Sequence, residues 1–141
     1  MRVGTVTQFR EPYGDRTRHA EAGGGLFSTV PDMLAFAQMV ARRGLALNGC
    51  RILSEGICEE WYRAQTPHSQ AGRTKKSYSF GMEVCPDEGK IAHGGAYGTY
   101  LKANWKQGTC CVTFVQKSRT LPDLKAAAIR TEAVCLGVKV Q

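Results

Sequence analysis

The chain has 141 residues, a formal net charge of +7, 43% hydrophobic residues and 22% charged residues, a composition typical of a soluble globular domain. It contains no apolar run near the roughly 20 residues of a membrane-spanning helix, and residues 1–8 lack the apolar core of a signal peptide. A cytoplasmic location without membrane contact is therefore expected for the chain as written. The basic residues are scattered, and their one dense cluster, at 73–76, is typical of a solvated loop, so no nucleic-acid partner is expected.

The chain is expected to form an irregular lead-in over residues 1–22, followed by a single domain over residues 23–141. The lead-in is polar and carries turn signals, whereas helical and strand periodicities begin after the glycines at 23–25. No internal repeat is visible.

Two helices are predicted first, over about 30–43 and about 55–65. Thr29 is the expected N-cap of the first helix and Gly44 its expected C-cap, while Ser54 is the expected N-cap of the second. Apolar residues at helical spacing give each helix one buried side. The residues expected to form these sides are Met33, Phe36, Ala37 and Val40, then Ile57, Cys58 and Trp61.

The period then changes to two, which predicts an antiparallel meander of about four strands. The first strand, 78–84, should bury Tyr78 and Phe80 with the other alternating apolar residues, and the last strand is apolar on both faces, which favours a central position. A C-terminal helix over about 121–136 should pack on the sheet. The fold class is thus α+β. The predicted strands are 78–84, 90–95, 98–105 and 109–116.

The six cysteines indicate no metal site. None belongs to a Cys-x-x-Cys pair, and Cys110 and Cys111 are adjacent, so on a strand they point to opposite faces. They are interpreted as small buried hydrophobes in a reducing compartment. No metal and no cofactor are expected.

Two segments resemble a known family. Residues 22–33 resemble the glycine-rich entry to a mid-chain helix in the serine β-lactamase and penicillin-binding-protein-like hydrolases, which include class C β-lactamases, D-alanyl-D-alanine carboxypeptidases and related esterases. Residues 78–83 and 93–99 resemble the late sheet of that family. The match covers roughly residues 22–136 and implies a partial β-lactamase-like fold, although relatives in this family are often exported.

The resemblance assigns a ligand-facing role to the stretch from His93 to Tyr97. It matches the family's third motif, with His93 in the cationic or hydrogen-bonding position, Gly94 where Ser or Thr often stands, and Gly95 as the small residue beside the substrate. The backbone N–H of Ala96 would be one oxyanion-hole donor, and Tyr97 would line the pocket. The alternative is structural: His93 forms a hydrogen bond across the sheet, and Gly94 and Gly95 mark only a bulge or tight packing.

The family's nucleophile motif, Ser-x-x-Lys, is missing from the sequence. No serine has a lysine three residues later, and the threonine version, Thr99 to Lys102, lies on a predicted strand that directs the two side chains to opposite sides. The chain is therefore expected to be a C-terminal module that is inactive alone and faces a small-molecule ligand of the lactam, peptide or ester type. The alternative is a binding or assembly module that forms a homo-oligomer or complements a separate N-terminal half.

Overall fold

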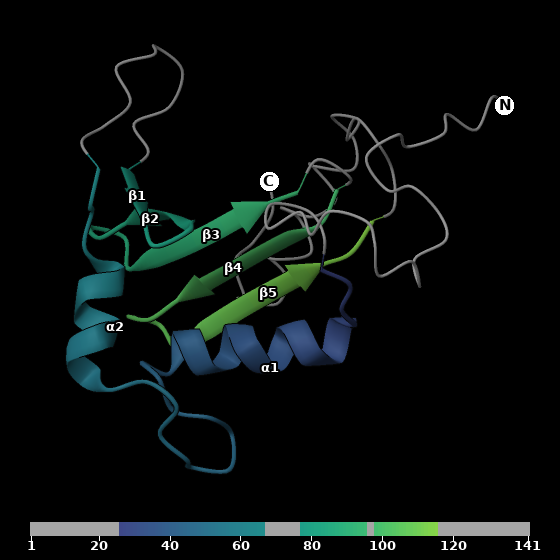
Figure 1. The fold of residues 1–141 in the computed structure, drawn as a ribbon, viewed down its shortest axis with the longest axis horizontal. Coiled ribbons are helices and arrows are strands. Elements are labelled where there is room, and N and C mark those ends of the chain that lie inside the picture. The colour runs from purple at the N-terminus through teal and green to yellow at the C-terminus, as the bar shows by residue number, and fades with distance from the viewer. Residues whose placement is uncertain (1–25, 67–76, 96–97, 116–141) are drawn as a thin grey trace, which may run out of the picture.

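A computed structural model of the chain describes residues 26–66, 77–95 and 98–115 (Figure 1). The strands form one antiparallel sheet in which each strand pairs with the next along the chain. The predicted α+β class is confirmed, with five strands in place of about four. The expected lead-in 1–22 and the expected helix 121–136 lie outside the described residues. The elements are α1 (Val30–Ala41), α2 (Glu55–Tyr62), β1 (Ser77–Ser79), β2 (Met82–Cys85), β3 (Lys90–Gly94), β4 (Tyr100–Asn104) and β5 (Thr109–Thr113).

Both helices begin where their capping residues predict. The Thr29 side chain accepts a hydrogen bond from the backbone N–H of Asp32 at 3.3 Å. The Ser54 side chain accepts one from the N–H of Ile57, also at 3.3 Å. Each bond satisfies a backbone donor that the first turn of a helix leaves without a partner.

The end of α1 differs from the expectation. The C-cap is Arg42, and the left-handed residue that follows it is Arg43, with φ of 55°; Gly44 comes next with φ of 88°. The N–H of Arg43 donates to the Val40 carbonyl at 3.1 Å, and the N–H of Gly44 donates to the Met39 carbonyl at 2.9 Å. This pair of bonds is the Schellman arrangement, which ends the helix at residue 41 and not at about 43.

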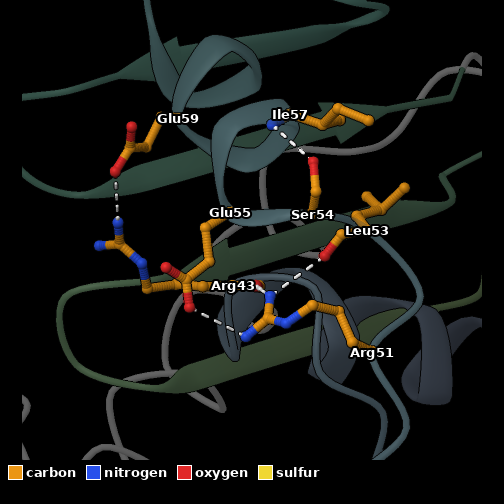
Figure 2. Close-up of polar contacts among 7 residues, drawn as sticks. All are labelled: Arg43, Arg51, Leu53, Ser54, Glu55, Ile57 and Glu59. Atoms are coloured by element: carbon orange, nitrogen blue, oxygen red, sulfur yellow. Dashed lines mark hydrogen bonds and ion pairs between the residues drawn. The ribbon is translucent and has the colours of Figure 1, made fainter.

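A polar joint fixes α2 against the end of α1 (Figure 2). The Arg51 guanidinium donates to the backbone carbonyls of Arg43 and Leu53, each at 3.1 Å, and forms an ion pair with Glu55 at 3.1 Å. A second ion pair, 3.6 Å long, joins Arg43 to Glu59. One side chain thereby joins backbone carbonyls from the two sides of the turn between the helices, so this turn is built by side chain and backbone together.

The predicted strand 78–84 is wrong, because the chain reverses inside it. β1 and β2 form a hairpin in which Ser79 pairs with Met82, and Gly81 takes a φ of 73° in the two-residue turn. The reversal also changes which residues are buried: Ser79 is 7% exposed, whereas Tyr78 is 39% and Phe80 is 63% exposed. The alternation correctly indicates strand structure, but it does not reveal the reversal at Gly81 and therefore assigns Tyr78 and Phe80 to the wrong side.

The core lies between the helices and one face of the sheet. α1 packs on β4 and β5, as Figure 1 shows. Ile91 on β3 and Ala103 on β4 are register partners, and both are fully buried. On α2 the buried residues are Cys58 and Tyr62, one turn apart, whereas Ile57 is exposed, so the predicted apolar side is rotated. The core cluster is Met39, Val40, Ala41, Cys58, Tyr62, Ile91 and Ala103.

The last strand is not central in the described sheet. β5 stands at one end of the strand order and β1 at the other. The apolar pattern of β5 has a different cause, since α1 packs on the end of the sheet that β5 forms. A strand can therefore be rich in apolar residues because a helix packs on it, without having a neighbour on each side.

Candidate functional site

The candidate site lies where β3 ends and turns into β4. His93 and Gly94 are the last residues of β3. The N–H of Gly95 donates to the Thr99 carbonyl at 2.7 Å, and the N–H of Gly98 donates to the Gly95 carbonyl at 3.1 Å. Gly98 has a φ of 84°, in the left-handed region that favours glycine. The predicted glycine-rich edge is therefore the tip of a closed hairpin.

The two glycines at this edge differ in the space around them. A Cβ at Gly94 would meet only ordinary contacts, the nearest being Tyr100 Cδ2 at 3.6 Å. A Cβ at Gly95 would lie 2.1 Å from Thr99 Oγ1. Both glycines are exposed. A side chain at Gly95 would have to displace the Thr99 hydroxyl, whereas Gly94 has room for a small side chain of the kind that the resemblance places there.

His93 is exposed and contacts an aromatic ring from another strand. The ring centroids of His93 and Tyr78 are 6.2 Å apart, with planes at 76°. The Tyr78 hydroxyl donates to Glu83 Oε1 at 3.5 Å. Sequence reasoning missed Tyr78 as a neighbour of His93, because the pattern placed it on the buried side of one long strand. The signal that would have found it is Gly81, which allows a reversal between β1 and β2.

The remaining predicted site residues, Ala96 and Tyr97, lie outside the described residues. Thr99 directly precedes β4 and Lys102 lies within it. Because side chains alternate along a strand, these two residues belong to opposite faces, as the sequence predicts.

The described serines occupy structural positions. Ser54 accepts the first hydrogen bond of α2, and Ser77 and Ser79 are buried in β1, at 4% and 7% exposure. Ser28 is exposed just before α1. None of them is followed by a lysine at the spacing that serine activation in this kind of site uses.

Two cysteines are unsuited to replace a serine nucleophile. Burial raises the pKa of the Cys58 thiol, against a smaller opposing effect of the Tyr62 hydrogen bond. Burial also raises the pKa of Cys110, and neighbouring Cys111 adds to the effect. Since the thiolate is the reactive form, a raised pKa lowers the fraction of reactive thiol at neutral pH.

The described ranges hold no group of three or more His, Cys, Asp or Glu side chains placed to bind a metal ion. Within the same ranges, no helix has both the length and the apolar character needed to cross a bilayer.

The sequence matches the family model named Beta-lactamase over residues 1–135. This match covers nearly the whole chain, and the helices and antiparallel sheet agree with it. The chain therefore belongs to the β-lactamase family, as the two resembling segments predicted. A comparison with curated proteins finds no match.

Proposed function

We propose that this chain supplies one wall of a serine-hydrolase cleft and binds a small lactam, peptide or ester without cleaving it alone. The observation that carries the proposal is the exposed His93-Gly94-Gly95 stretch at the end of β3 in a β-lactamase-family chain that contains no Ser-x-x-Lys. Without a nucleophile and its base, the first covalent step of acyl transfer has no attacking atom.

Each residue of the wall has a proposed task. The imidazole of His93 would donate a hydrogen bond to a carboxylate or carbonyl group of the ligand. Gly94 and Gly95 would let the ligand lie along the backbone, since neither has a side chain. The backbone N–H of Ala96 would donate to the ligand's carbonyl oxygen, as one half of an oxyanion hole, and Tyr97 would contact the ligand beside it.

Two measurements on the pure chain test this function. Turnover of a chromogenic cephalosporin and of a p-nitrophenyl ester should stay at the background rate, and saturation-transfer NMR should detect cephalosporin binding. His93→Gln should weaken that binding, whereas the matched variant His68→Gln should not. Turnover that one serine substitution abolishes would contradict the inactive half-site, and equal binding by both histidine variants would contradict the role of His93.

A second function, as an assembly module, is favoured by the strand order. β1 and β5 end the described sheet, and an edge strand offers N–H and C=O groups to another strand. The partner would be a second copy of the chain or a separate N-terminal half that carries the nucleophile. Light scattering over a wide concentration range tests self-association. A strictly monomeric chain that also fails to bind a co-expressed N-terminal half would exclude this alternative.

A further inference from the structure

Tyr78 and His93 meet although their strands are not neighbours. β2 lies between β1 and β3 in the sheet, yet the two rings are 6.2 Å apart and nearly perpendicular. This separation and angle fall within the range in which the positive edge of one ring is attracted to the negative face of another. The contact therefore has a preferred geometry, and it restricts the rotation of the imidazole.

Tyr78 is itself held by hydrogen bonds of its backbone and has a further contact at its hydroxyl. Its carbonyl accepts hydrogen bonds from the N–H groups of Gln65 and Thr66, at 2.9 Å and 3.1 Å, and its N–H donates to Thr66 Oγ1 at 3.1 Å. Its hydroxyl reaches Glu83, its register partner on β2. A ring anchored through backbone and hydroxyl can serve as a fixed surface for a neighbour.

The neighbours of His93 along the chain do little to fix its imidazole. The two residues that follow it are glycines, which provide no side chain to contact the ring. His93 is also exposed at the end of its strand. An exposed side chain without such contacts samples several rotamers, so a neighbouring ring decides how often the imidazole occupies one of them.

We propose that Tyr78 is a positioning residue that orients the His93 imidazole at the wall of the cleft. The consequence for ligands rests on the function proposed above, but the orientation itself does not. Tyr78 touches no ligand in this proposal and acts only through His93.

NMR of the intact chain tests the orientation directly. Nuclear Overhauser contacts between the Tyr78 and His93 ring protons should be present in the unsubstituted protein, with His93→Gln used for assignment. Tyr78→Leu should shift the His93 ring resonances, because the ring current is lost, whereas Tyr78→Phe should retain most of the shift. Phe80→Leu is the matched control, since Phe80 lies in the same hairpin and is exposed. Missing Overhauser contacts, or equal shifts in the Leu variants of Tyr78 and Phe80, would overturn the proposal.

A binding measurement separates this proposal from the function on which it rests. If the chromogenic cephalosporin binds the unsubstituted chain, Tyr78→Leu should weaken binding about threefold to tenfold, the range expected from an aromatic pair, and Tyr78→Phe should restore it. If neither cephalosporin nor ester binds the unsubstituted chain, the proposed function fails, and the NMR contacts still decide the role of Tyr78. Binding that is unchanged by Tyr78→Leu would overturn the positioning role.

Discussion

Gly95 and Thr99 approach each other so closely across the β3–β4 hairpin that a side chain at Gly95 would have to displace the Thr99 hydroxyl. The N–H of Gly95 donates to the Thr99 carbonyl at 2.7 Å, and a Cβ at Gly95 would lie 2.1 Å from Thr99 Oγ1. The same threonine thus closes the hairpin through its backbone, and its hydroxyl occupies the place that a Cβ at Gly95 would take. A small residue at Gly95 therefore suits the hairpin itself, before any ligand is considered.

Gly95→Ala should lower the free energy of unfolding by about 0.5–1.5 kcal/mol, the cost of moving the Thr99 side chain out of its preferred rotamer. Gly94→Ala is the matched control and should change it by less than about 0.5 kcal/mol, because its site is open. Urea denaturation measures both. In a Thr99→Ala background the cost of Gly95→Ala should fall, since the colliding hydroxyl is gone. An equal cost in both backgrounds would show that the collision is not the cause.

Gly44→Ala should be more destabilising than Gly49→Ala, although both glycines have a positive φ, of 88° and 85°. A Cβ at Gly44 would lie 2.4 Å from the Leu53 carbonyl oxygen, whereas one at Gly49 would meet nothing within 4 Å. The left-handed backbone costs each alanine about 1–2 kcal/mol, and the collision at Gly44 adds about 1–3 kcal/mol. Thermal or urea unfolding of the two variants gives the comparison. Similar losses would mean that the joint between α1 and α2 yields to the added methyl group.

Ser79→Ala should stabilise the protein by about 1 kcal/mol, because the fold buries the Ser79 hydroxyl and, among the described residues, provides no hydrogen-bond partner for it. Ser77 is equally buried on the same strand but does have an interaction partner. Ser77→Ala should therefore destabilise by about 1 kcal/mol. Urea midpoints measure the two effects. A loss of stability in both variants would indicate that the Ser79 hydroxyl finds a partner in solution.

Tyr62→Phe should destabilise the protein by about 1 kcal/mol at neutral pH, because the buried Tyr62 hydroxyl donates to the Val40 carbonyl at 2.5 Å. The substitution removes only the hydroxyl, so the phenyl ring of the variant should still stack on Trp105, which lies 4.2 Å from the Tyr62 ring between centroids.

Stability should also fall in alkaline solution, and Tyr62→Phe should reduce that fall. Burial raises the pKa of Tyr62 above its ordinary value of 10.0, and burial raises the pKa of Cys58 above 9.0. The folded state therefore keeps protons that the unfolded chain releases, so this stability is fully present below about pH 9 and is lost as the pH rises. Urea denaturation from about pH 8 to about pH 11 should show the two proteins converging. A constant difference in unfolding free energy over that range would contradict the raised pKa of Tyr62.

Local features of the sequence determined the starts of the helices and the fold class. Thr29 and Ser54 cap the helices as predicted, since a capping hydrogen bond spans only three residues. The change of period near residue 78 correctly indicated antiparallel strands, and the two family segments correctly indicated the β-lactamase family. The glycine-rich edge after His93 was also visible, because a glycine pair needs no distant partner to be recognised.

Only the tertiary structure decided which residues meet and which are buried. The reversal at Gly81 exposed Tyr78 and buried Ser79, which the alternation alone assigned the other way. The packing of α1 on β5, the edge strand of the described sheet, joins two segments that are far apart in the sequence. The contact between Tyr78 and His93 joins two strands across a third, so its geometry depends on the register and twist of the sheet, which no short stretch of sequence specifies.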